Sequence, residues 1–180
     1  LFLDGQRLGY GPERGDPYNW FYETYDLDLS PGEHVLVARV WSLGDLAAMA
    51  QMTVHPGFLL AAEGDWQERL STGLAPWEAK PLPGYSFIRP RFAHWRAHTT
   101  RMDGALYPWG VEQGAGEGWQ PVRRLEKGIG QIIDWEYYKI HVLKPATIPA
   151  PIDQPVTSFR VRHVAPASDS ATMPVPVQAA

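Results

Sequence analysis

Cysteine is absent from this 180-residue chain. Its absence excludes disulfide bonds, thiolate metal sites and cysteine nucleophiles, and it leaves the compartment open, because a disulfide-free protein can work inside or outside a cell. Long apolar runs are lacking too, since the longest extends only from Gly57 to Ala62. A membrane-spanning helix needs roughly 20 apolar residues. We therefore expect a soluble chain without a membrane partner.

An excess of charge of either sign is also missing. The chain carries 16 basic and 20 acidic residues, its formal net charge is -4, and it has no run of like charges. A protein that binds nucleic acid usually concentrates Lys and Arg into a basic patch that meets the phosphates. The charge pattern therefore predicts no nucleic-acid partner.

Motifs of common catalytic classes are lacking as well. The nearest approach to a nucleophile elbow, Gly84-Tyr-Ser-Phe-Ile88, lacks the second glycine that the sharp turn needs. His94 and His98 have the spacing of a zinc-binding helix, but Trp95 stands where a metalloprotease helix carries its Glu. This favours ordinary histidines over a metal site, and no residue pattern predicts a cofactor.

Carboxylates are the remaining catalytic option, because glycosidases place two of them across the scissile bond. Several pairs are close in sequence, and their number makes none of them specific. These pairs are Glu13 with Asp16, Asp26 with Asp28, Glu112 with Glu117, and Asp134 with Glu136. Acidic residues in turn-rich segments are typical solvated turn or cap residues, so we predict no catalytic residue in this chain.

Strand and turn signals, by contrast, are abundant. Asp4-Gly5 between short apolar runs predicts a β-hairpin, and the apolar run His34–Trp41 predicts a central strand, with Trp41 in the core. The 17 prolines disfavour long helices. Short strands separated by turns predict an all-β chain, a β-sandwich or galactose-binding-like jelly roll with Pro-rich loops and an irregular C-terminal tail.

The two ends of the chain suggest its organisation. Leu1 is not an initiator methionine, so we expect a fragment. Residues 165–180 are small, Pro-rich and aperiodic. We therefore predict a β-sandwich accessory domain over residues 1–163, followed by a linker or the first strand of another domain over residues 164–180.

Aromatic residues exceed what one small core can enclose, with eight tryptophans and eight tyrosines. Some rings should therefore be exposed, and flat rings beside carboxylates and amides suit a sugar, whose C–H face stacks while its hydroxyls find polar partners. Binding residues concentrate in loops. The candidate ligand-binding residues, from two predicted loops, are Asp16, Asn19, Trp20, Trp109 and Glu112.

Several segments of the chain are similar to a known family of enzymes. The segments are Leu3–Pro12, Glu23–Leu29, Ser30–Trp41, Gly64-Asp-Trp66, Gly118-Trp-Gln-Pro121 and Leu143–Pro149. In this order they resemble the N-terminal β-sandwich region of bacterial α-L-rhamnosidase-type (family 78) glycoside hydrolases.

The resemblance implies a non-catalytic accessory domain, because the catalytic carboxylates of these enzymes lie in a downstream (α/α)6 barrel. The implied partner is the catalytic domain on the same polypeptide. Glycans that contain rhamnose or galactose are candidate ligands, and related sandwiches sometimes use calcium. An independent lectin-like carbohydrate-binding module is the alternative, and a free-standing small enzyme is the third hypothesis.

Overall fold

The computed structural model describes residues 1–13, 15, 19–43, 57–88, 99–125, 128–129, 141–154, 156–158 and 160–164. The chain divides into two units, Leu1–Ala150 and Pro151–Ala180. The described residues of the second unit form neither helix nor strand, and their apolar side chains are exposed. The predicted boundary after residue 163 stays a prediction.

Strands dominate the regular structure of the first unit. No helix in the described part of the chain has the length and apolar character needed to cross a membrane. The strands are β1 (Phe2–Leu3), β2 (Gln6–Arg7), β3 (Trp20–Tyr22), β4 (Leu36–Val37), β5 (Glu78–Ala79), β6 (Tyr85–Ile88), β7 (Thr99–Met102), β8 (Gln120–Pro121), β9 (Gly128–Ile129) and β10 (His141–Pro145), and the helical segments are η2 (Gly64–Trp66), α1 (Gln67–Leu70) and η3 (Val111–Gln113). The all-β class predicted from the sequence is confirmed at this level.

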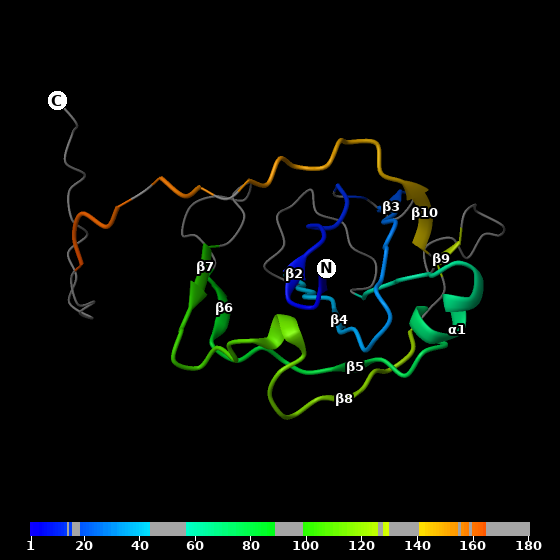
Figure 1. Cartoon of the computed structure of the whole chain (residues 1–180), viewed down its shortest axis with the longest axis horizontal. Helices are drawn as coiled ribbons and strands as arrows, with labels where there is room; N and C mark the ends of the chain where they lie inside the picture. The colour runs from blue at the N-terminus through cyan, green and yellow to red at the C-terminus, as the bar shows by residue number, and fades with distance from the viewer. Residues whose placement is uncertain are drawn as a thin grey trace. The chain divides into compact units, whose positions relative to one another are not determined.

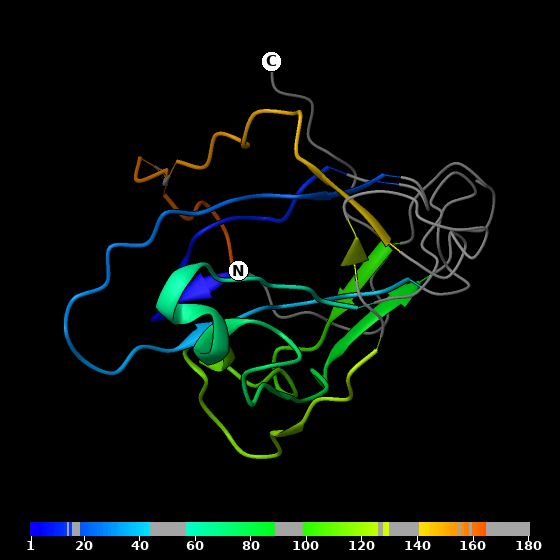
Figure 2. The same cartoon turned by 90° about the vertical axis from the view of Figure 1, so that its right-hand side faces the viewer.

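The strands form small sheets joined by long loops (Figure 1). One sheet has the order β2-β1-β4 and is antiparallel, and a second has the order β3-β10-β9 and is parallel. β5 pairs with β8, and β6 pairs with β7, both antiparallel. Figure 2 shows β6 and β7 side by side, with α1 as the main helical element.

The hairpin predicted at Asp4-Gly5 is present. β1 pairs with β2 in the register Phe2 to Arg7 and Leu3 to Gln6. Asp4 has φ of 50° and Gly5 has φ of 80°, which are the two positive φ values that a tight hairpin turn of type I′ requires. The local prediction is confirmed because turn chemistry alone sets this geometry.

The prediction of a central strand over residues 34–41 is wrong. β4 covers only Leu36–Val37, which pair with Leu3 and Phe2 of β1, and it lies at the edge of the described sheet. Beyond β4 the chain leaves the sheet, and Trp41 is 61% exposed. Its ring packs against Phe87, with centroids 5.9 Å apart. The assignment of Trp41 to the core is therefore also wrong.

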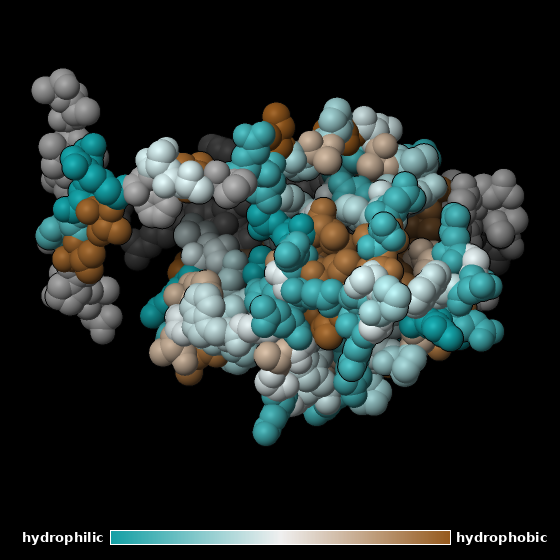
Figure 3. Space-filling view, in the orientation of Figure 1, coloured by the Kyte–Doolittle hydropathy of each residue, from teal (hydrophilic) through white to brown (hydrophobic). Residues whose placement is uncertain are grey.

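In the described part of the chain, the core centres on β1, β4 and η3. The buried apolar residues described there are Phe2, Val37, Leu43, Tyr107, Val111 and Val142. η3 packs against both β1 and β4, and the contact is close at Gly114, where an added Cβ would lie 3.0 Å from Cγ1 of Val35. Other large apolar side chains reach the surface, where hydrophobic atoms lie among hydrophilic ones (Figure 3).

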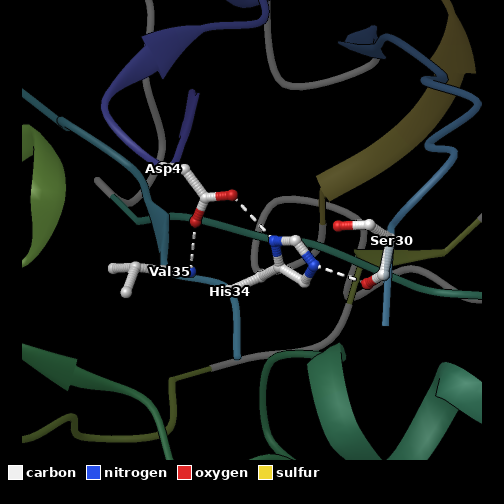
Figure 4. A network of polar contacts seen from close by, with 4 residues as sticks. All are labelled: Asp4, Ser30, His34 and Val35. Atoms are coloured by element: carbon white, nitrogen blue, oxygen red, sulfur yellow. Dashed lines mark hydrogen bonds and ion pairs between the residues drawn. The ribbon is translucent and has the colours of Figure 1, made fainter. Parts of the chain in front are cut away.

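A polar network fastens the hairpin turn to β4 (Figure 4). Asp4 Oδ1 accepts a hydrogen bond from the Val35 backbone N–H at 2.8 Å, and its Oδ2 lies 2.7 Å from Nδ1 of His34. The second ring nitrogen of His34 lies 2.8 Å from the carbonyl oxygen of Ser30. Because both nitrogens face acceptors, the protonated imidazolium is the form that satisfies the network.

The Asp4–His34 pair predicts a pH-dependent stability. The hydrogen bond between His34 and Asp4 is the main cause that raises the pKa of His34, and the contact of His34 with the Ser30 carbonyl oxygen is the next. Because the pKa of His34 is raised in the folded state, the stabilisation of the fold by the Asp4–His34 pair is complete below the ordinary imidazole pKa of about 6.5. This stabilisation is lost as pH rises through the folded-state pKa of His34. The urea midpoint should therefore fall between pH 6 and pH 8.5, and it should fall less in His34→Gln.

The Asp4–His34 pair also makes the stability of the fold decrease at acidic pH. The hydrogen bond from the Val35 N–H is the main cause that lowers the pKa of Asp4, and the hydrogen bond with His34 is the next. The stabilisation of the fold by the ionised Asp4 is therefore present above the ordinary aspartate pKa of about 3.9, and it is lost as pH falls below that value. Identical pH profiles for the natural protein and His34→Gln in urea unfolding would contradict the role given to His34.

The exposure of Trp41 gives a second prediction. Because its ring is largely in solvent, Trp41→Ala should lower the free energy of unfolding by only about 1 kcal/mol, part of it through the contact with Phe87. Phe2→Ala is the matched core truncation, since Phe2 is 9% exposed, and it should cost about 3 to 5 kcal/mol. Urea unfolding of both variants checks the difference, and equal losses would place Trp41 in the core after all.

Candidate functional site

The most exposed tryptophan among the described residues lies in the loop before η3. Trp109 is 70% exposed, yet its indole N–H donates to the carbonyl oxygen of Gly104 at 2.8 Å. Its ring also meets the ring of Tyr107 edge-on, with centroids 5.2 Å apart. An exposed indole is thus held in a fixed orientation, with apolar surface open to solvent.

The turn that carries these rings is fastened to β6. The backbone N–H of Asp103 donates to the carbonyl oxygen of Gly84 at 2.7 Å, and the N–H groups of Leu106 and Tyr107 donate back to the carbonyl oxygen of Asp103. Gly84 has φ of 79°, and an added Cβ would lie 2.6 Å from that same Asp103 oxygen. Only glycine lets the backbone approach this closely.

A charged pair lies next to Tyr107. Glu112 Oε1 accepts hydrogen bonds from the Tyr107 hydroxyl at 2.8 Å and from Nη1 of Arg39 at 3.2 Å. The Arg39 guanidinium also lies over the ring of Phe2, 5.5 Å from its centroid. Burial raises the pKa of Tyr107, an effect that its bond to Glu112 reinforces and its bond from Arg39 opposes. The hydroxyl therefore stays a neutral donor that orients the carboxylate.

This charged pair keeps unused hydrogen-bonding capacity. Within the described residues, Glu112 Oε2 accepts no hydrogen bond, and Nε and Nη2 of Arg39 donate none. The side chain of Arg39 is 41% exposed and that of Glu112 is 23% exposed. The cluster of Trp109, Tyr107, Glu112 and Arg39, called here the Trp109 site, thus combines an apolar face with hydroxyl donors and acceptors.

The other predicted candidates lie on a different element. Asn19 immediately precedes β3, and its side-chain oxygen accepts a hydrogen bond from Nζ of Lys144 at 2.5 Å. Trp20 was predicted in a loop, but it is half-buried in β3 and pairs with Leu143 of β10. Asp16 lies outside the described residues. The structure thus unites Trp109 with Glu112 and places Asn19 and Trp20 in a sheet.

The carboxylate of Glu13 is occupied by the chain itself. It accepts hydrogen bonds from the backbone N–H of Thr147 at 2.6 Å and from the Thr147 hydroxyl at 2.7 Å. The backbone N–H is the main cause that lowers the pKa of Glu13. In the described ranges no group of three or more His, Asp or Glu side chains could hold a metal ion, and His94 and His98 lie outside those ranges.

Two residues of the Trp109 site were not predicted from the sequence. The sequence could have indicated Arg39, because a single charged residue in the otherwise apolar run from Val35 to Trp41 suggests a specific partner. Its charge is explained by its partner Glu112 on η3. Tyr107 carried no such signal, because it is one of eight tyrosines in segments of similar composition.

Comparison of the chain with protein-family models, with curated proteins and with solved structures gave no match.

Proposed function

We propose that this chain is a non-catalytic, sugar-contacting accessory part of a larger α-L-rhamnosidase-type glycoside hydrolase, built as a β-sandwich or jelly roll that packs against the catalytic part. The parentage is supported by the resemblance of the sequence segments that begin with Leu3 and run to Pro149. The hairpin at Asp4-Gly5 lies within the first of those segments.

The observation that carries the sugar contact is the fixed, exposed ring of Trp109. Most of the Trp109 side chain remains in water, and a pyranose can cover this apolar surface with its C–H face. Because the Gly104 carbonyl already holds the indole, a ligand need not spend free energy on ordering it. This preorganisation favours a binding surface.

The polar half of the Trp109 site complements the hydroxyls of a sugar. Glu112 Oε2 can accept from one hydroxyl, and the remaining N–H groups of Arg39 can donate to the oxygen of another. Because the opposite charges of these two side chains offset each other, a neutral ligand suits the pair better than an ion. We infer that the ligand is a neutral saccharide.

Titration calorimetry with rhamnose and galactose tests the sugar contact. Binding should be weak, with Kd of about 1 mM, because an open surface buries little of the ligand and must displace water from its polar groups. Trp109→Ala should abolish the binding. Trp66→Ala is the matched control, since Trp66 is 48% exposed and its ring has a cation partner in Arg69.

Two further arms complete this experiment. Trp20→Ala should leave sugar binding intact, and loss of binding in that variant but not in Trp109→Ala would move the site to β3. Each titration is repeated with calcium and with EDTA, because the resemblance allows for a calcium ion. Absence of any heat with both sugars, in a protein shown to be folded by circular dichroism, would reject the sugar contact.

The chain alone should not hydrolyse nitrophenyl α-L-rhamnoside. Hydrolysis requires a protonated acid and a second carboxylate across a closed sugar site. Glu112 is engaged by Tyr107 and Arg39, and the lowered pKa of Glu13 keeps it ionised at neutral pH. Release of nitrophenol is the measurement, and sustained turnover abolished by one carboxylate-to-amide substitution would make the chain an enzyme.

A further inference from the structure

Five aromatic rings form a continuous row that ends at Trp109. Each ring contacts the next, with centroid separations between 5.2 and 6.4 Å, within the usual range for packed aromatic pairs. The row, called here the aromatic row, runs Trp41, Phe87, Tyr85, Tyr107, Trp109.

The row is assembled from segments that are distant in sequence. Trp41 follows β4, while Tyr85 and Phe87 both lie on β6, two positions apart and therefore on the same face of the strand. Tyr107 and Trp109 come from the turn that Gly84 fastens to β6. The pairing of β6 with β7 fixes the middle of the row.

Exposure alternates along the row. Trp41 is 61% exposed, Tyr85 43% and Trp109 70%, whereas Tyr107 is only 5% exposed. Phe87 is intermediate. Along the row, the two less exposed rings therefore separate the three exposed ones.

We propose that the aromatic row is an extended platform for an oligosaccharide, with the Trp109 site as its polar end. The inference rests on the proposed sugar contact at Trp109 and adds the class of ligand. A single pyranose covers one indole, whereas successive residues of a glycan chain can lie over Trp109, Tyr85 and Trp41 in turn. Arg39 and Glu112, which contact Tyr107 in the row, add partners for the hydroxyls of the glycan.

The occupant follows from the chemistry of the row. Its exposed members are all aromatic, and each offers a flat apolar face. Polar groups lie beside these faces, because Tyr85 carries a hydroxyl and Tyr107 lies next to the charged pair of Arg39 and Glu112. A pyranose presents the same combination, an apolar face surrounded by hydroxyls.

Affinity as a function of chain length tests the proposal. The probes are methyl α-L-rhamnoside with its α-linked disaccharide and tetrasaccharide, and the corresponding galactose series, each titrated by calorimetry. The tetrasaccharide should bind at least about tenfold more tightly than the methyl glycoside of the same sugar, because further rings are covered.

Two variants separate the ends of the row. Trp109→Ala should weaken binding of every probe. Trp41→Ala should weaken the tetrasaccharide about tenfold and leave the methyl glycoside unchanged. Trp66→Ala is again the control for exposed tryptophan and should change none. Because Trp41 is largely exposed, its truncation leaves a folded protein for the titration, which urea unfolding verifies.

Each result decides between the two proposals. Equal affinities for all lengths, or a tetrasaccharide that binds Trp41→Ala as tightly as the natural protein, would overturn the extended platform and leave the Trp109 site standing. An equal loss of the methyl glycoside and the tetrasaccharide in Trp41→Ala would also overturn it. If no probe of either sugar binds, both the platform and the sugar contact are rejected.

Discussion

The pairing of β1 with β4 holds the small core and the Trp109 site in one arrangement. The ladder is only two residues long, and two such strands are marginal in water without further contacts. Asp4 supplies those contacts, because its carboxylate binds both the backbone and the ring of the segment that enters β4. η3 packs on these strands, and the Arg39–Glu112 pair joins the segment after β4 to η3. Binding surface and core therefore share one scaffold.

Local chemistry accounts for the parts of the fold that the sequence predicts well. The turn at Asp4-Gly5 depends on two adjacent residues that tolerate positive φ, so a four-residue window contains its cause. The run from His34 to Trp41 is different, because the strands that pair with an apolar run and the side chains that cover it decide whether it becomes a buried strand. Of this run, Leu36 and Val37 pair with β1, and Trp41 packs against Phe87 of β6. The pattern inside the run does not contain these partners.

The residues of the candidate site also differ in whether nearby or distant parts of the sequence determine their position. The sequence indicates that Trp109 and Glu112 lie near each other, because both belong to one turn-rich segment whose backbone bonds hold it together. Their role in binding a ligand stays a prediction. Trp20 was placed in a loop because its partner in β10 is remote in sequence. Tyr107, which joins Trp109 to the charged pair, was not distinguishable from other tyrosines before its neighbours were known.

The parallel pairing of β3 with β10 has a consequence for how the chain folds. The bonds that flank this pair, from Lys144 to Asn19 and from Thr147 to Glu13, span 125 and 134 positions of the sequence. Closing so long a loop must precede any gain from the contacts, and proteins dominated by such contacts fold slowly. On the ribosome, β3 must wait until β10 has been synthesised. A stretch of aromatic residues at positions 20–22 thus lacks its partner strand until the residues about 125 positions later have been synthesised, and this period is when a chaperone would matter most to the yield of folded protein.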